Sequence, residues 1–481
     1  MRIAFSLLSS AYLKNFESVV TLLADRGHRV SLITHERSGW AGSEELGRRL
    51  EQASPNISFE QAPPQEDVFL DASAKIRACS DYVQFLDPKY NDTYRARAVK
   101  RVPKSIKDQL DRTDGAVRRR LLGGALAMGE MAVPPSPAIE RFMARLRPDI
   151  MLLTPYVGLS TIQPAYLRAA RASGAHTVVC VGSWDHLTSK SRLRPMPDLV
   201  TVWNETQKAE AIELHGVPES RVAVTGAQCF DQWFNWEESP RGDFCERIGL
   251  DPERPYVLYT CFSPFKGGAN EAEFVQRWIR QLRSRPEPEL QGVGVLIRPH
   301  PKRIAQWQDV DLSGLENVVC WPREPKLAGD RETKAGLYDS IKHSACVVGI
   351  NTSAMIEAGI VGRRVHTILA PEYYSSQMGT FHFPYMLEVG GGLVEVAQSF
   401  GEHFEQLATS IAKPGRAEAN RGFVESFVRP HGIDVESTPR WVEAIEALGP
   451  GSPRRVEGLR TAPVVRRVLA PALARATTAL R

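Results

Sequence analysis

Residues 346–369, with the sequence CVVGINTSAMIEAGIVGRRVHTIL, decide which fold this chain adopts. An apolar run ends at Ile350, polar residues follow, and a helical pattern extends from Ser353 to Val361 before a second apolar run. The order strand, helix, strand is the repeating unit of a parallel α/β sheet. We therefore predict one such unit in this stretch.

The same order recurs along most of the chain. Beyond residue 250, apolar runs lie at 255–263, 292–301 and 316–321, and helical patterns at 271–283 and 334–344. Before residue 235, helical patterns alternate with apolar runs at 2–9, 28–34, 149–156, 176–182, 198–205 and 221–226. We predict an α/β protein with two Rossmann-like, doubly wound domains, over 1–235 and 250–400. Ligands of such sheets bind beyond the carboxyl ends of the strands, so we expect the two domains to face a cleft that holds the active site.

The bulk composition fits this prediction. The chain has 481 residues, of which 43% are apolar and 24% charged, as in globular proteins of two or three domains. Its seven cysteines lack CxxC spacing, so we expect reduced thiols without metal-binding or catalytic roles. The amino-terminal apolar run fits a first strand better than a secretion signal, and no run approaches ~18 apolar residues. We expect a cytoplasmic protein.

Two segments concentrate positive charge, although the net charge is only +4. The first is a helical insertion at about 70–135, which either is simply solvated or forms a basic surface for a membrane or an anionic acceptor. Its cations are Arg95, Arg97, Lys100, Arg101, Lys104, Lys107, Arg112, Arg118, Arg119 and Arg120. The second is the tail at 447–481, read as a disordered end or a peripheral membrane contact. Residues 401–446 are predicted as helices that complete the second domain or cross back to the first, and no nucleic-acid-binding pattern is present.

The turn after Ile350 is the first candidate site. Asn351, Thr352 and Ser353 lie where a helix begins, and the unpaired N–H groups and dipole of a helix amino terminus favour an anionic diphosphate. Glu357, one turn further along the helix, is placed to accept the hydroxyls of a ribose. The structural alternative is an ordinary N-cap with Glu357 facing solvent.

The sequence LIRPHPKR, at 296–303, supplies a second set of candidates. A strand ends in Arg298, His300 and Lys302, and the intervening prolines restrict the backbone that carries them. Three cationic groups at one strand end suit phosphate recognition, and His300 can also donate a proton to a departing diphosphate. The alternative is a turn bounded by prolines with a surface histidine.

The sequence GSWDHLTSKSR, at 182–192, follows a strand of the first domain. Asp185 or His186 is a candidate general base for an acceptor hydroxyl, and Lys190 is a candidate phosphate ligand. A structural loop, tied to backbone N–H groups by Asp185, is an equally good interpretation.

Two further loops carry weaker signals. Ser263 and Lys266 follow a strand, but their surroundings do not match the GxxxxGK[ST] phosphate-binding loop. His382 lies in a loop ahead of the consecutive glycines 390–392, which either approach a sugar or form a turn. The sequence contains no HExxH, GxSxG or GxGxxG motif and no paired aspartates for a divalent ion, so we predict a metal-independent reaction and no metal site.

Taken together, IRPHP at 297–301 and INTSAMIEAGIVGRRVHTIL at 350–369 resemble the nucleotide-binding half of GT-B glycosyltransferases, UDP-N-acetylglucosamine 2-epimerases and CDP-glycerol glycerophosphotransferases. SWDHLTSK at 183–190 is similar to bacterial surface-polysaccharide members, which have Asn where this chain has His186. The resemblance implies that His300 stabilises the leaving diphosphate. It also implies that Thr352, Ser353 and Glu357 bind phosphate and ribose, and that the first domain binds the acceptor.

The expected function is a metal-independent glycosyltransferase that moves a sugar from a nucleotide-sugar donor to a surface polysaccharide or glycolipid. The expected partners are this donor, a glycan or lipid-linked acceptor and the inner membrane surface. We expect no tightly bound cofactor. The alternatives are a UDP-sugar 2-epimerase, a CDP-polyol phosphotransferase and a non-catalytic scaffold of polysaccharide assembly.

Overall fold

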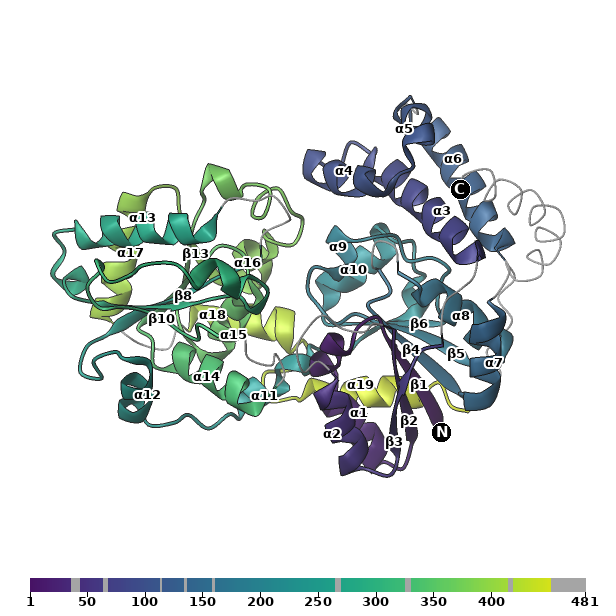
Figure 1. The fold of residues 1–481 in the computed structure, drawn as a ribbon, viewed down its shortest axis with the longest axis horizontal. Coiled ribbons are helices and arrows are strands. Elements are labelled where there is room, and N and C mark those ends of the chain that lie inside the picture. Colours follow the sequence, from purple (N-terminus) through teal and green to yellow (C-terminus); the bar gives the residue numbers. More distant parts are fainter. Residues whose placement is uncertain are drawn as a thin grey trace. The chain divides into compact units, whose positions relative to one another are not determined.

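The chain forms two compact α/β units (Figure 1). The first unit holds the described residues up to Gln228 together with those from Thr438 onward, and the second unit holds Cys229–Ser437. This computed structural model describes residues 1–35, 44–63, 68–112, 115–133, 136–157, 161–263, 270–324, 330–413 and 418–450.

The first unit contains a seven-stranded parallel sheet in the order β3-β2-β1-β4-β5-β6-β7. The order changes direction between β1 and β4, as in doubly wound sheets. The strands are β1 (Arg2–Leu7), β2 (Arg29–Thr34), β3 (Ile57–Gln61), β4 (Ile150–Thr154), β5 (His176–Cys180), β6 (Leu199–Val202) and β7 (Val222–Val224).

Helices cover both faces of this sheet because side chains alternate along each strand. In β4, Ile150 and Leu152 join the cluster of α1, α2 and α19, whereas Met151 and Leu153 join that of α7 and α8. The helices of these layers are α1 (Glu17–Asp25), α2 (Glu45–Ala53), α7 (Pro137–Leu146), α8 (Gln163–Ala172) and α19 (Ser437–Glu446). The short α9 (His186–Ser189) and α10 (Glu205–Glu213) follow β5 and β6.

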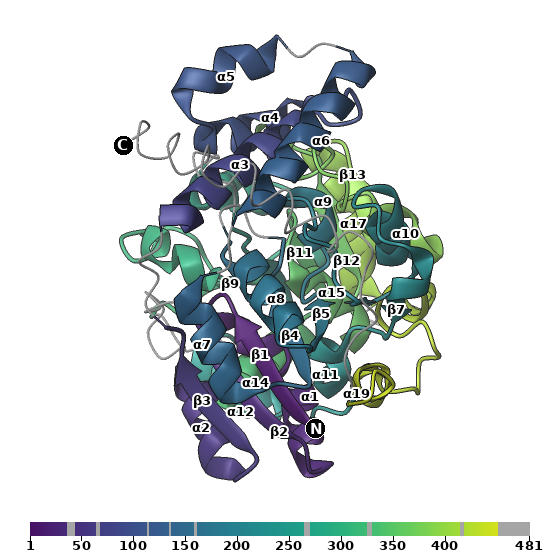
Figure 2. The same ribbon diagram turned by 90° about the vertical axis from the view of Figure 1, so that its right-hand side faces the viewer.

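The basic segment between β3 and β4 forms a helical layer of its own. It consists of α3 (Val68–Phe85), α4 (Asp92–Ala98), α5 (Lys104–Asp111) and α6 (Ala116–Ala132). Both views show α3 and α6 side by side (Figures 1 and 2). Buried Glu130 of α6 lies between Arg77 of α3 and Arg168 of α8, at 3.5 and 3.8 Å, and this links the layer to the α/β core.

The second unit contains a six-stranded parallel sheet in the order β10-β9-β8-β11-β12-β13, with its change of direction between β8 and β11. Its strands are β8 (Tyr256–Thr260), β9 (Gly294–Arg298), β10 (Val318–Cys320), β11 (Cys346–Gly349), β12 (Val365–Ile368) and β13 (Val394–Ala397). Its helices are α11 (Asp231–Phe234), α12 (Arg241–Ile248), α13 (Glu271–Arg283), α14 (Arg331–Lys342), α15 (Ser353–Val361), α16 (Tyr385–Glu388), α17 (Phe400–Ala412) and α18 (Ala419–Phe423).

The carboxyl-terminal helices are divided between the two units. Helices α17 and α18 belong to the second unit, and the chain then returns to the first unit as α19. The indole N–H of buried Trp441 in α19 donates to Thr201 Oγ1 at 3.1 Å, and Glu446 pairs with Arg26 and His28. Helix α19 is therefore an integral part of the first unit's core.

The predicted α/β architecture with two Rossmann-like sheets is confirmed. Two strands escaped prediction, β3 and β13, which both lie at sheet edges. The expectation that the two sheets face a common cleft stays a prediction.

Candidate functional site

Three neighbouring strands of the second unit deliver the predicted residues to one edge of the sheet. Thr260, Arg298 and Gly349 are register partners at the carboxyl ends of β8, β9 and β11. The chain beyond them carries Ser263, His300 and Asn351. Because neighbouring strands lie about 4.8 Å apart, the ends of β9 and β11 are roughly 10 Å apart, with β8 between them. The candidate residues therefore surround the point where the strand order reverses, which is where open α/β sheets bind ligands.

Helix α15 begins at this edge. Thr352 is its N-cap, with φ −145° and ψ 150°, and its Oγ1 lies 3.5 Å from the amide nitrogen of Ala354, at the long limit for a capping hydrogen bond. Ser353 is exposed, and Glu357 is half-buried one turn deeper. The first-turn N–H groups and the helix dipole thus point to the strand ends.

A glycine at the end of β11 allows α15 to approach the sheet. A Cβ at position 349 would lie 2.9 Å from Thr260 Oγ1 and 3.0 Å from Met355 Cγ. The glycine is required here by this close approach. It fixes the helix terminus over the strand ends.

The loop before α16 closes one side of the same region. The Asn351 side-chain amide donates to the Ser376 carbonyl and lies 3.4 Å from His382 Nε2. Gln377 is buried and donates to the carbonyls of Ile350 and Ile368, which fastens the loop to β11 and β12. Asn351 Oδ1 is buried without a hydrogen-bond partner among the described residues.

His300 has a defined tautomer. Its Nδ1 accepts a hydrogen bond from the backbone N–H of Lys302 at 3.1 Å. In a neutral imidazole the proton then resides on Nε2, which becomes the donor atom. His300 is half-exposed and Lys302 is exposed, so both are accessible at the strand end.

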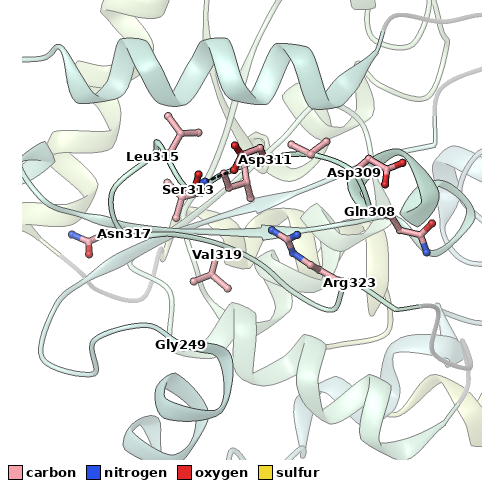
Figure 3. Close-up of a pocket in the computed structure, with 12 residues that line it drawn as sticks. Gly249, Gln308, Asp309, Asp311, Ser313, Leu315, Asn317, Val319 and Arg323 are labelled. Atoms are coloured by element: carbon pink, nitrogen blue, oxygen red, sulfur yellow. Dashed lines mark hydrogen bonds between the residues drawn. The ribbon is translucent and has the colours of Figure 1, made fainter.

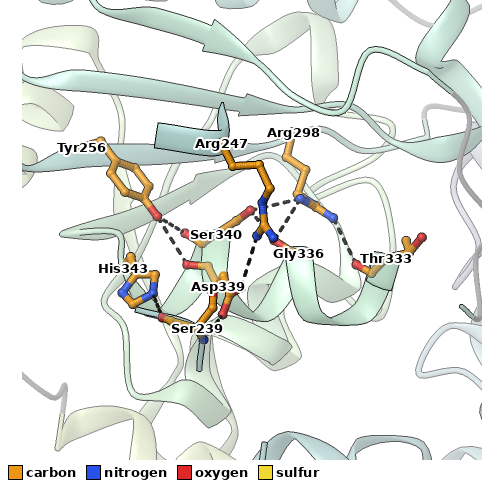
Figure 4. Close-up of polar contacts among 9 residues, drawn as sticks. All are labelled: Ser239, Arg247, Tyr256, Arg298, Thr333, Gly336, Asp339, Ser340 and His343. Atoms are coloured by element: carbon orange, nitrogen blue, oxygen red, sulfur yellow. Dashed lines mark hydrogen bonds and ion pairs between the residues drawn. The ribbon is translucent and has the colours of Figure 1, made fainter. Parts of the chain in front are cut away.

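Arg298 has a different environment from the one expected for a phosphate ligand. It is 8% exposed, and its guanidinium donates to the carbonyls of Thr333 and Gly336 and to Ser340 Oγ, all in α14 (Figure 4). Burial lowers the pKa of Arg298 to about 10, and the negative charge of Glu357 partly opposes this shift. These contacts give Arg298 a structural role that the sequence did not reveal. Glu357 lies within electrostatic range of this cation.

Sequence reasoning missed a buried acid beside the site. Glu271, in the first turn of α13, is inaccessible to solvent and accepts the backbone N–H of Phe262 at 3.2 Å. Burial raises the pKa of Glu271 well above its ordinary value. Its carboxyl group holds the chain where it leaves β8 toward Ser263. Lys266, the other candidate of this loop, lies outside the described residues.

In the first unit, the Asp185 carboxylate is held by its own loop. It accepts hydrogen bonds from Ser183 Oγ at 2.6 Å and Ser189 Oγ at 3.1 Å, and it pairs with Lys190 Nζ at 3.1 Å. His186 is 3% exposed, and burial lowers its pKa to about 4, which leaves a neutral imidazole at pH 7. The partners of Asp185 in these contacts are side-chain groups and not the backbone N–H groups of the structural-loop interpretation, and the general-base assignments stay predictions.

A depression of about 630 Å³ lies elsewhere in the second unit (Figure 3). Its walls are the loop from Gln308 to Asn317, the edge strand β10 and Arg323. The sequence-predicted site residues do not line this depression, so we place the candidate site at the strand ends of β8, β9 and β11.

The two parallel, doubly wound units give the chain the GT-B fold. No family model and no curated protein sequence matches the chain. Among solved structures, a glycosyltransferase from Rickettsia africae is similar at 10% identity and a TM-score of 0.51, over 93% of this chain and 98% of that chain.

Two UDP-GlcNAc 2-epimerases are equally similar. The enzyme from Methanocaldococcus jannaschii is 12% identical with a TM-score of 0.51, over 93% of this chain and 100% of that chain. The Neisseria meningitidis enzyme, bound to UDP-GlcNAc, is 11% identical with a TM-score of 0.52 at the same coverage. At these identities the likeness establishes the fold, and the reaction must be argued from the site.

Proposed function

We propose that the protein is a metal-independent glycosyltransferase that uses a nucleotide-sugar donor. The observation that carries this proposal is the arrival of His300 and the α15 terminus at one edge of the sheet, on either side of β8. A donor diphosphate would lie against the first-turn N–H groups of α15, with Ser353 beside it. Glu357 would accept the ribose hydroxyls.

Departure of a nucleoside diphosphate leaves negative charge on a phosphate oxygen. The Nε2–H of His300 and the α15 dipole would stabilise this charge without a metal ion, because both present partial positive charge at fixed positions. The acceptor would be a hydroxyl of a surface polysaccharide or glycolipid. His382 would orient the sugar or nucleotide through Asn351.

A panel of nucleotides and one variant test this proposal. Thermal shift and calorimetry with UDP, GDP, CDP and CMP should identify one nucleoside diphosphate that stabilises the protein.

His300→Ala should lower transfer from the matching nucleotide sugar about 100-fold, since one donor to a developing oxyanion contributes roughly 3 kcal/mol. The folded state should be unchanged, and His431→Ala, at an exposed histidine remote in sequence from the strand end, should transfer normally. Unaltered transfer by His300→Ala would refute the assignment.

A 2-epimerase is the second candidate, favoured by the structural likeness to two such enzymes. Incubation of the protein with its nucleotide sugar in the absence of an acceptor distinguishes the reactions. An epimerase equilibrates the sugar at C2, whereas a transferase leaves the donor intact. Release of CMP would indicate a polyol phosphotransferase, and failure to bind any nucleotide would favour a scaffold.

A further inference from the structure

Helix α6 presents an exposed apolar face formed by Val117, Leu121, Ala125 and Met128, which we call the α6 face. The side chains of Val117, Leu121 and Met128 are 72%, 69% and 49% exposed. Their positions follow the spacing i, i+4, i+8 and i+11, so they share one side of the helix. Large apolar side chains grouped on one exposed face indicate an interaction surface.

The opposite side of α6 is fixed to the first unit. Glu130 forms ion pairs with Arg77 and Arg168, and a Cβ at Gly129 would lie 3.7 Å from Ile76 of α3. The helix is therefore anchored by packing on α3, as both ribbon views show (Figures 1 and 2). Because the opposite side of the helix packs on α3, the α6 face points toward solvent.

Exposed cations flank the α6 face on its own helix and occur in the preceding helical segment. Arg118 and Arg120, in the turn between Val117 and Leu121, are both exposed. In the described residues from 99 to 129, the exposed acids are Asp108 and Asp111, and Asp111 is paired with Lys107. The other exposed cations of this stretch are Lys100, Arg101, Lys104 and Arg112.

We infer that the α6 face docks on an anionic lipid surface. Apolar side chains of this arrangement enter the boundary between headgroups and acyl chains, while arginine and lysine meet lipid phosphates. A second copy of the chain fits less well, because two α6 faces would bring like charges together. The carboxyl-terminal segment 451–481 also fits poorly, since it holds seven arginines and one acid. None of the described helices is long and apolar enough to cross a bilayer.

Vesicle sedimentation with the full-length protein tests this inference, and it requires no nucleotide. The protein should bind vesicles of equal phosphatidylglycerol and phosphatidylcholine and should not bind pure phosphatidylcholine. Raising NaCl from about 0.1 to 0.5 M should weaken binding at least tenfold, because salt screens the phosphate contacts. Leu121→Glu and the double variant Arg118→Gln, Arg120→Gln should each weaken binding at least tenfold.

Two matched controls accompany these variants. Met378→Glu places the same charge at an apolar side chain of the second unit that is 42% exposed. The double variant Arg254→Gln, Arg280→Gln removes two exposed cations of the second unit. Both controls should bind vesicles like the parent protein.

Three outcomes would overturn the inference. Equal binding to both vesicle types would exclude an anionic lipid surface as the partner, and normal binding by Leu121→Glu would exclude the α6 face as the lipid contact. A dimer in sedimentation velocity that Leu121→Glu dissociates would assign the face to a second copy. A large loss of thermal stability in Leu121→Glu would show that the face is covered by the chain itself.

Discussion

At the scale of single residues, the motif from 298 to 302 separates into two environments. Arg298 is buried and satisfies groups of α14, whereas His300 and Lys302 emerge beyond the strand. Arg298 therefore stabilises the fold, whereas His300 and Lys302 are accessible to a ligand. Sequence alone did not separate them, because the carbonyls that Arg298 meets belong to a helix more than thirty residues away.

Arg298→Met should destabilise the second unit. It removes the donors to Thr333, Gly336 and Ser340 and leaves buried acceptors unsatisfied, at a cost of about 2–4 kcal/mol. The guanidinium carbon also lies 5.0 Å from the centroid of the Trp321 ring, and an uncharged methionine cannot make this cation–π contact. Urea unfolding measures the change. Lys302→Met, at the exposed position, should stay within about 0.5 kcal/mol of the parent. Equal stability of the two variants would contradict the structural role of Arg298.

The other site residues differ in whether the sequence alone could identify them. Thr352 and His300 could be identified because each immediately follows an apolar strand. Glu271 could not, because an acid in the first turn of a helix normally faces solvent and stabilises the dipole. Its burial depends on the path of the loop from β8, which carries no recognisable motif. The contact of Asn351 with His382 likewise depends on how a distant loop folds back.

At the scale of secondary-structure elements, the central strands and the helices between them were the predictable part. Helices α13 and α15 begin and end where the apolar periodicity places them, at Glu271–Arg283 and Ser353–Val361. Strands β3 and β13 escaped prediction because their sequences, ISFEQ and VEVA, mix polar and charged residues with the apolar ones. Both edges lie away from the strand order reversal, so their omission did not affect the candidate site.

Gly349→Ala tests the placement of α15. The new methyl group would lie 2.9 Å from Thr260 Oγ1 and 3.0 Å from Met355 Cγ, so the first turn of the helix must shift. We expect a loss of about 1–3 kcal/mol in stability and at least a tenfold loss in nucleotide affinity, measured by urea unfolding and calorimetry. Gly123→Ala in α6 is the matched control, because no atom of the described residues lies within 4 Å of its added methyl group. It should stabilise the protein by about 0.5–1 kcal/mol. Undiminished nucleotide affinity in Gly349→Ala would remove the α15 terminus from the site.

At the scale of the whole molecule, both units bury neutral histidines. His186 and His215 lie in the first unit and His366 and His403 in the second, with at most 4% exposure. Burial lowers the pKa of His403 to about 3 and those of the other three to about 4. These folded-state pKa values lie below the unfolded-state pKa of about 6.5. The contribution of the neutral histidines to the stability of the fold is therefore complete above pH 6.5 and is lost as the pH falls. At pH 5 each histidine should have lowered the free energy of unfolding by about 2 kcal/mol relative to neutral pH.

Two buried acids act in the opposite direction. Burial raises the pKa of Asp81 to about 7 and that of Glu271 well above its ordinary value, so their destabilisation at neutral pH is relieved as the pH falls. Burial also lowers the pKa of His35 to about 4. With these five histidines against two acids, the melting temperature should fall by about 2–5 °C between pH 7.5 and 5. Asp81→Asn removes one opposing acid, so its melting temperature should fall more steeply than that of the parent. His403→Gln removes one histidine and should flatten the profile. Calorimetry of the three proteins at both pH values measures these slopes, and parallel profiles would show that burial of these groups does not control the acid response.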